Sequence, residues 1–200
     1  LIPFHRYPDR PRTPVEEHLV EAKAYVRDQK GTARVHFTLS PEHESEIRAH
    51  VDAVRARWET PGIRYEVGFS LQRPSTDTIA VDLENRPFRK EDGRLLFRPG
   101  GHGALLGNIE DLRADIVFIK NIDNVVPDRI KGATYTYKKA LGGYLVELQD
   151  HIFQYLRILA GGPPDPEKLE EMIQFTHDFL CPLSSPEDPT PGIRDRVQFL

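Results

Sequence analysis

The spacing of apolar residues along the chain predicts helices that alternate with strands. The first helix is expected from about Pro14 to Arg27, because Thr13-Pro14-Val15-Glu16 has the form of a capping box with proline at the first helical position. The segment Arg34 to Ser40, RVHFTLS, is rich in β-branched and aromatic residues and predicts a strand. A second helix follows Ser40-Pro41, and its apolar residues form one stripe on one helical face: Ile47, Val51, Val54 and Trp58.

The middle of the chain predicts further strands and one short helix. The segments Arg64 to Gln72 and Arg94 to Pro99 have strand composition, and the polar loop between them ends in the turn sequence KEDGR. Gly103 to Leu112 is expected to form a short helix. The run DIVFIKN, Asp115 to Asn121, hardly alternates between apolar and polar residues, which is typical of a strand buried on both faces.

The last part of the chain predicts helices only. Tyr137 to Leu159 and Pro166 to Leu180 have helical patterns, with a break at Gly161-Gly162-Pro163-Pro164. Strands that alternate with helices favour a three-layer α/β fold, in which helices flank a mostly parallel central sheet. We therefore expect one α/β domain over residues 1–160, which a helical extension over 161–200 continues. Such sheets bind ligands beyond the carboxyl ends of their strands.

Composition and charge exclude several classes of partner. The formal net charge is -4, and no block of Lys or Arg is long enough to neutralise a row of phosphates, so nucleic acid is not an expected partner. No apolar run approaches the roughly 20 residues that span a bilayer, and the N-terminus lacks the pattern of a signal peptide. The single cysteine, Cys181, excludes an internal disulfide and a Cys-rich zinc site. We expect a cytoplasmic protein that binds small molecules.

The sequence GGHG, at Gly100 to Gly103, is the first candidate for ligand chemistry. Glycines have no side chain, so backbone N–H groups can approach a ligand closely, and the start of the following helix would favour an anion. The His102 side chain would then face that ligand. The alternative is a glycine-rich turn in which His102 only caps the helix, and the motif alone favours neither interpretation.

The tetrad Asn121-Ile122-Asp123-Asn124, directly after the predicted buried strand, is the second candidate. Magnesium prefers oxygen ligands and binds through one or two carboxylates plus substrate phosphates, so the single carboxylate of Asp123 would suffice. The alternative is an Asx turn, in which these side chains bond nearby backbone groups. We favour a metal site, because GGHG and the tetrad lie one strand apart at the edge where such sheets bind ligands.

Three other polar residues near these motifs each have two interpretations. The amide of Gln72, at the end of a predicted strand, can pair with a base edge, although a Gln at a strand end is common. Lys120 is either a phosphate contact or a solvated surface charge. Asp128 is either a second carboxylate ligand or a helix-cap residue. The chain contains no Gly-x-Ser-x-Gly elbow, Walker P-loop or Rossmann glycine fingerprint.

Three stretches resemble, in order and spacing, the eukaryotic-type UDP-sugar pyrophosphorylases: GFSLQ, RPGGHGAL and DIVFIKNIDNVVPD. The corresponding stretches of that family read like Phe-x-Gln, Pro-Pro-Gly-His-Gly-Asp and Ser/Val-Asp-Asn. A longer region, from about Pro3 to Leu159, resembles an uncharacterised bacterial family of unknown function that is assigned to the nucleotidyltransferase-like fold; it includes TPVEEHLVEA, HFTLSPEHE, QRPSTDTIAVD and YKKALGG. The resemblance implies a nucleotide-diphospho-sugar transferase-like, Rossmann-like fold.

The resemblance also implies roles for individual residues. Asp123 would hold magnesium near the phosphates, and Lys120 would be the basic catalytic side chain beside them. The other substrate contacts would come from Gln72, at the uracil ring, and from Gly101, His102, Gly103, Asn121 and Asn124, on the nucleotide and sugar.

The implied reaction is nucleotidyl transfer from a nucleoside triphosphate, with UTP favoured, to a sugar 1-phosphate. A phosphate oxygen of the sugar 1-phosphate attacks the α-phosphorus in line, and pyrophosphate leaves. In the family that it resembles, a glycine-rich loop and a lysine follow the first strand and hold the triphosphate. The chain lacks that segment, and its GGHGA lacks the acidic residue after the motif, so we expect a fragment truncated at both ends. The alternatives are a binding or regulatory module without turnover, and a fragment whose motifs are only turns.

Overall fold

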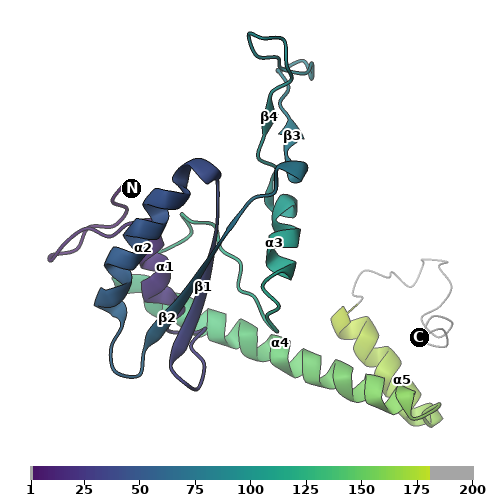
Figure 1. The fold of residues 1–200 in the computed structure, drawn as a ribbon. Helices are drawn as coiled ribbons and strands as arrows, with labels where there is room; N and C mark the ends of the chain where they lie inside the picture. Colours follow the sequence, from purple (N-terminus) through teal and green to yellow (C-terminus); the bar gives the residue numbers. More distant parts are fainter. Residues whose placement is uncertain (1, 181–200) are drawn as a thin grey trace. The chain divides into compact units, whose positions relative to one another are not determined.

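The computed structural model describes residues 2–180 (Figure 1). The chain divides by its internal contacts into two units, Leu1–Ala140 and Leu141–Leu200. Cys181 and the end of the predicted helical extension, 181–200, lie outside the described residues. Within the described part, none of the helices combines the length and the apolar character that a membrane span requires.

The first unit is a mixed α/β structure around a small parallel sheet. Strand β1 (Thr32–Leu39) pairs in parallel with β2 (Arg64–Leu71), which confirms both predicted strands. The pairing places alternate apolar residues of the two strands opposite one another, such as Phe37 opposite Phe69. Helices α1 (Pro14–Ala22) and α2 (Glu44–Trp58) contribute to the same core, whose buried members are Val15, Leu19, Ala33, Phe37, Val51, Val54 and Tyr65.

Helix α1 begins where the capping box predicts and ends earlier than expected. The Thr13 side chain accepts a hydrogen bond from the backbone N–H of Glu16, and Pro14 is the first helical residue. The predicted end at Arg27 is wrong, because the chain leaves the helix after Ala22 and turns into β1. Helix α2 follows a 3₁₀ turn (Pro41–His43), and its predicted apolar stripe is confirmed.

The region between β2 and GGHG is a two-stranded arm rather than a polar loop (Figure 1). Strand β3 (Thr78–Ile79) pairs antiparallel with β4 (Phe97–Arg98), so the strand predicted from Arg94 to Pro99 is shorter than expected. The turn KEDGR is confirmed: the Gly93 N–H donates to the Lys90 carbonyl, and Gly93 has a φ of +80°, which favours glycine.

After the arm, a 3₁₀ turn (His102–Leu105) leads into the short helix α3 (Leu106–Glu110), as predicted. The strand predicted for Asp115 to Asn121 is wrong, because this segment runs without regular structure. An apolar run forms a strand only where a neighbouring strand supplies hydrogen bonds, and in the described residues β1 pairs with β2 alone. The parallel sheet therefore has two strands, which is smaller than the central sheet that we expected.

The helices predicted for the last part of the chain are confirmed over the described residues. Helix α4 (Lys131–Ala160) follows a 3₁₀ turn (Asp128–Ile130), and α5 (Pro166–Phe175) leads into a π-helical turn (Thr176–Leu180). The Asp165 side chain caps α5 by accepting from the Lys168 N–H. In the second unit, the Tyr155 hydroxyl donates to Glu171 at 2.8 Å, which links α4 to α5.

Candidate functional site

Gln72 directly follows the carboxyl end of β2 and lies next to the first glycine of GGHG. Its side chain is half-buried, and Nε2 is 3.5 Å from the Thr76 hydroxyl oxygen. A Cβ placed on Gly100 would lie 3.8 Å from Gln72 Nε2 and only 2.7 Å from the Thr76 carbonyl oxygen. Position 100 therefore requires a glycine, because any side chain there would collide with backbone. The segment GFSLQ, which ends at Gln72, therefore lies near the start of GGHG.

His102 joins GGHG to the tetrad. It is exposed, and its Nε2 lies 2.7 Å from Oδ1 of Asn121, so that the ring donates this hydrogen bond from Nε2. A Cβ on Gly101 or Gly103 would meet nothing within 4 Å, so the space beside both backbones is open. The helix after the motif, α3, is short, so its dipole adds little to the attraction of an anion.

Asp123 lies in an exposed turn. The Asn124 N–H donates to the Asn121 carbonyl at 3.0 Å, which closes the turn through backbone groups and not through the Asx side chains considered from the sequence. Within residues 2–180, no hydrogen bond or ion pair occupies the carboxylate of Asp123. This carboxylate and the exposed Asn124 amide are therefore accessible to a ligand.

Two side-chain contacts hold the tetrad against α1. His18 Nε2 lies 3.0 Å from the carbonyl oxygen of Ile122, and the Lys120 ammonium is hydrogen bonded to the buried carboxylate of Glu21. The Lys120 side chain is only 10% exposed. Burial lowers the pKa of His18, so the ring is neutral at pH 7 and donates this hydrogen bond as a neutral imidazole.

An open groove of about 1590 Å³ lies beside the candidate site. Apolar side chains from α1, from β1 and from residues 112–122 form much of its wall, and His102, Lys120 and Asn121 line it as well. Gln72 and Asp123 are not part of this lining. The groove therefore adjoins the contact between His102 and Asn121 and does not contain the whole set of predicted residues.

The arrangement offers polar ligand contacts but no ready-made metal centre. Among the described residues, no three His, Cys, Asp or Glu side chains gather in a way that could hold a metal ion. Asp123 and Asp128, the two carboxylates considered from the sequence, have different environments, because Asp128 is paired with Arg12 at 2.9 Å and with Lys131 at 3.2 Å.

We use the name motif cluster for Gln72, Gly100, Gly101, His102, Gly103, Asn121, Asp123 and Asn124.

A second polar assembly, around α1, was not expected from the sequence. Three glutamates on this helix are buried, with relative exposures of 1% or less: Glu16, Glu17 and Glu21. A buried carboxylate is costly unless a cation or several hydrogen bonds compensate it. We use the name α1 ionic cluster for these glutamates and their partners, which are His5, Tyr7, Arg10, Arg12, Tyr25, Trp58, Lys120, Asp128 and Lys131.

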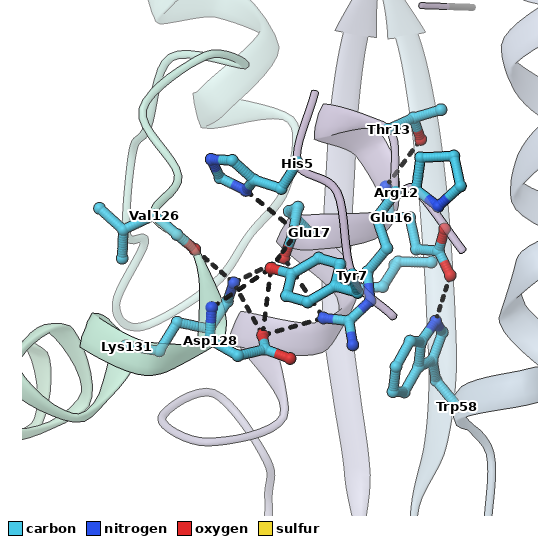
Figure 2. A network of polar contacts seen from close by, with 12 residues as sticks. His5, Tyr7, Arg12, Thr13, Glu16, Glu17, Trp58, Val126, Asp128 and Lys131 are labelled. Carbon is cyan, nitrogen blue, oxygen red and sulfur yellow. Dashed lines mark hydrogen bonds and ion pairs between the residues drawn. The ribbon is translucent and has the colours of Figure 1, made fainter. Parts of the chain in front are cut away.

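Glu17 is the centre of the α1 ionic cluster (Figure 2). Its carboxylate accepts hydrogen bonds from Lys131 Nζ at 2.5 Å and from the Tyr7 hydroxyl at 2.6 Å, and His5 Nδ1 lies at 3.1 Å. Burial, and then the hydrogen bond to Glu17, raise the pKa of Tyr7 well above its ordinary value. The phenol is therefore a fixed donor at any physiological pH.

Asp128 is the carboxylate partner of Arg12, which is a second cation of the α1 ionic cluster beside Lys131. The Arg12 guanidinium lies over the Tyr7 ring at 3.9 Å and beside the Trp58 ring at 4.7 Å, and Arg12 donates to Asp128 at 2.9 Å (Figure 2). Burial alone would raise the pKa of Asp128, but hydrogen bonds from Arg12 and Lys131 outweigh it and hold that pKa below its ordinary value.

Glu16 and Glu21 are compensated in the same way. Glu16 accepts hydrogen bonds from Arg10 and, at 2.8 Å, from Trp58 Nε1. Burial acts to raise the pKa of Glu16, but these two partners lower it overall. Glu21 accepts from Tyr25 at 2.8 Å and from Lys120. Two buried atoms of the cluster, Glu21 Oε2 and Arg12 Nε, have no hydrogen-bond partner in the described residues, but each of the three carboxylates is paired with a cation, which points to a structural role.

The sequence contained one signal for the α1 ionic cluster. Basic residues Arg10 and Arg12 stand a few positions before the acidic pair Glu16-Glu17, so opposite charges are close along the chain. Their burial depends on Asp128 and Lys131, which are distant in sequence, and no local pattern predicts that contact. Asn108, which the structure places against the end of β2, was also missed.

Comparisons with known proteins place the chain in a family but attach no activity to it. No curated protein and no solved structure matches the chain. One family model, described as "Domain of unknown function (DUF4301)", matches residues 1–199, which is almost the whole chain. The chain therefore belongs to the DUF4301 family.

Proposed function

We propose that the motif cluster binds a nucleoside triphosphate and a sugar 1-phosphate, and that the protein transfers the nucleotidyl group between them. The observation that carries this proposal is the hydrogen bond of 2.7 Å between His102 and Asn121, which joins GGHG to the tetrad. Gln72, just beyond the carboxyl end of β2, lies near the start of GGHG, since a Cβ on Gly100 would be 3.8 Å from its Nε2, and α/β sheets bind ligands at this end of their strands. The nucleotide-diphospho-sugar transferase-like fold is part of the same proposal.

In this proposal the side chains of the motif cluster orient the two substrates. The Gln72 amide pairs with the uracil ring, and the open backbone at Gly101 and Gly103 approaches the nucleotide and sugar. His102 and Asn121, which fix each other, present the rest of their hydrogen-bonding groups to the substrate, together with Asn124. Orientation of this kind is the main contribution that a protein makes to phosphoryl chemistry.

The reaction that we propose is an in-line displacement. A phosphate oxygen of the sugar 1-phosphate forms a bond to the α-phosphorus of the triphosphate, with UTP favoured. The bond from that phosphorus to the bridging oxygen of the β-phosphate breaks, and pyrophosphate leaves with the electron pair.

Asp123 is the residue that we propose for magnesium. Its carboxylate is exposed and has no partner in residues 2–180, and one carboxylate plus substrate phosphates is a common set of magnesium ligands in proteins. When bound, magnesium would offset the negative charge of the phosphates. The donor set therefore fits a magnesium ion that arrives with the nucleotide.

Lys120 stays a proposed catalytic residue, but its hydrogen bond to Glu21 restricts how it can act. Its ammonium is hydrogen bonded to Glu21, which is 0% exposed, so a contact with phosphate would leave a buried carboxylate without its cation. That loss would cost several kcal/mol. The arrangement favours a role in which Lys120 anchors the tetrad and contributes its charge from that position.

The second candidate function is a binding or regulatory module without turnover. It is favoured by the absence, among residues 2–180, of a group of acidic or imidazole side chains that could hold a metal by themselves. Such a module would bind a nucleotide sugar through Gln72 and His102 and release no pyrophosphate.

Pyrophosphate release by the full-length protein tests the proposal. The assay would contain magnesium, each of the four nucleoside triphosphates and a panel of sugar 1-phosphates, and would compare the protein with Asp123→Ala. Asp52→Ala is the matched control, because Asp52 is an exposed aspartate on α2, outside the motif cluster. We expect release with one pair of substrates, loss of release in Asp123→Ala and no loss in the control.

The other outcomes separate the candidates. Saturable binding of a nucleotide sugar without pyrophosphate release would replace transfer by the binding module. Release that is unchanged in Asp123→Ala would contradict the metal role of Asp123. A folded protein that neither binds nor reacts would contradict both candidates.

A further inference from the structure

Asn108 is a buried polar residue that neither the sequence motifs nor the proposed roles include. It lies on α3 and is 4% exposed. Its Nδ2 donates to the hydroxyl oxygen of Ser70 and to the carbonyl oxygen of Leu71, both at 2.9 Å. Because these residues directly precede Gln72, Asn108 binds the end of β2, just before the residue that we propose to contact the base.

Burial of Asn108 lowers the stability of the fold, because one of its polar atoms has no partner within residues 2–180. Both of its donor hydrogens are used, but its Oδ1 atom is buried and has no hydrogen-bond partner among the described residues. An unsatisfied buried acceptor destabilises a protein, and an apolar side chain of similar size would avoid that cost. The two hydrogen bonds to the end of β2 are the feature that an apolar side chain cannot provide.

The segment around Gln72 is also attached to α3 through Arg73, the residue that follows Gln72. Arg73, which directly follows Gln72, donates to the Asp111 carboxylate at 2.6 Å, just after the end of α3. Its guanidinium lies against Gly107, where a Cβ would be 3.0 Å from Nη1. Residues on both sides of Gln72 are therefore attached to α3.

Helix α3 in turn continues directly from the 3₁₀ turn that begins at His102. The position of α3 against β2 therefore sets the separation of Gln72 from His102. The tetrad with Asp123 is held differently, because His18 and Lys120 attach it to α1. The two ends of the motif cluster thus have separate anchors, in addition to the hydrogen bond that joins His102 to Asn121.

We infer that Asn108 is a positioning residue, which sets the spacing between Gln72 and His102 and thereby the affinity for the nucleotide. This inference rests on the proposed function. If Asn108 only stabilised the fold, a change there would not act on nucleotide binding in particular. As a positioning residue, a change at Asn108 weakens the binding of the nucleotide, or raises its KM. It leaves kcat nearly unchanged, because Asp123 keeps its own anchors.

The test uses three variants of the full-length protein. Asn108→Leu removes both hydrogen bonds and keeps the volume of the side chain. Ser70→Ala removes one of the two acceptors without a change in α3, together with the contacts of the Ser70 hydroxyl with His36 at 2.9 Å and Thr38 at 3.2 Å. Leu106→Ala is the control, because Leu106 is on the same helix and 69% exposed. For each variant we would measure the Kd for UDP-glucose, the melting temperature of the free protein and the NMR shifts of the His102 ring.

We expect Asn108→Leu to raise the Kd about tenfold, in line with the sensitivity of bound geometry to small displacements. The His102 ring signals should shift while the melting temperature changes little, and Ser70→Ala should show smaller effects of the same kind. Leu106→Ala should resemble the unmodified protein. If Asn108→Leu unfolds the protein, Ser70→Ala alone decides the outcome.

The inference is overturned if Asn108→Leu and Ser70→Ala bind UDP-glucose like the unmodified protein, or if affinity falls only in proportion to the melting temperature. If the unmodified protein binds no UDP-glucose, the proposed function fails for this ligand. In that case the His102 signals decide separately whether Asn108 positions the motif cluster: unchanged signals in Asn108→Leu would contradict it, and shifted signals would support it.

Discussion

The α1 ionic cluster and the motif cluster use polar residues in opposite ways. Around α1, buried carboxylates face an almost matching set of cations and hydroxyls, as with Glu17 between Tyr7 and Lys131. In the motif cluster, His102 and Asp123 are exposed, and the Asp123 carboxylate has no partner within residues 2–180. The first assembly has little capacity left for a ligand, whereas the second has open hydrogen-bonding groups.

This difference shows how a structure separates structural from ligand-accessible polar residues. A charge that is buried and compensated by the protein stabilises one arrangement of its segments. A polar group that is exposed, close to others of its kind and without a partner costs little in the free protein and is available to a ligand. Lowered pKa values, such as those of Glu16 and Asp128, here mark the structural assembly.

The largest effect on stability is expected at Glu17. Glu17→Leu would remove the buried carboxylate beside Lys131, which is 2% exposed, and leave Asp128, at 3.2 Å, as its remaining anionic partner in the described residues. We expect a loss of about 3–5 kcal/mol in the free energy of unfolding, measured by denaturant titration. Glu44→Gln, which removes only the exposed pair of Glu44 with Arg48, should change it by less than about 1 kcal/mol. Equal effects of the two changes would contradict the structural role of the cluster.

A double substitution sharpens this prediction. In Glu17→Leu with Lys131→Met, the buried anion and its cation are removed together, while the pair of Arg12 with Asp128 is kept. Because the unpaired charge is the main cost of the single change, the double variant should recover about 1–4 kcal/mol of the loss. Simple addition of the two single effects, measured in the same titration, would show that charge pairing is not what holds the cluster together.

Stability should also fall in acid, through Glu16 and Asp128. Both have a pKa in the folded protein below the ordinary values of 4.5 and 3.8, so the unfolded state takes up protons first. The stability that they contribute is fully present above those ordinary values and is lost as the pH falls through the lower folded values. The half-buried rings of His18 and His36, whose pKa is lowered from 6.5 by partial burial, act in the same direction at higher pH. Melting temperatures between pH 7 and 3 would show the decline, and Glu16→Gln should make the acid part of the curve shallower.

The smallest effect on stability is expected at Asp123. Asp123→Ala removes an exposed carboxylate without a partner in the described residues, so the free energy of unfolding should change by less than about 0.5 kcal/mol. The same change should abolish any dependence of nucleotide binding on magnesium, which a calorimetric titration with and without the ion would measure. A large loss of stability would mean that Asp123 belongs with the structural residues.

Local features were predicted well from the sequence, because they depend on neighbours along the chain. The cap at Thr13 and the strands β1 and β2 are confirmed. The strand predicted at Asp115 to Asn121 was wrong, because pairing requires a partner strand that composition does not specify. The burial of Glu17 and Glu21 was not evident from the sequence, because their cations Lys131 and Lys120 are far away along the chain.

The candidate site was predicted in part. The expectation that GGHG and the tetrad lie close together agrees with the contact of His102 with Asn121. The structure adds that Lys120 is turned towards Glu21 and that Asn108 binds the end of β2. Both depend on how segments pack and not on the residue types within a motif.

The most direct test of the central claim is an NMR titration of the histidine side chains with UDP-glucose and magnesium. We predict saturable shifts of the His102 ring signals, because this ring lies between GGHG and the tetrad. The ring of His50, which is hydrogen bonded to Thr13 at 2.7 Å beside the α1 ionic cluster, should not shift. Unchanged His102 signals at saturating ligand, or equal shifts of both rings, would contradict a nucleotide-sugar site at the motif cluster.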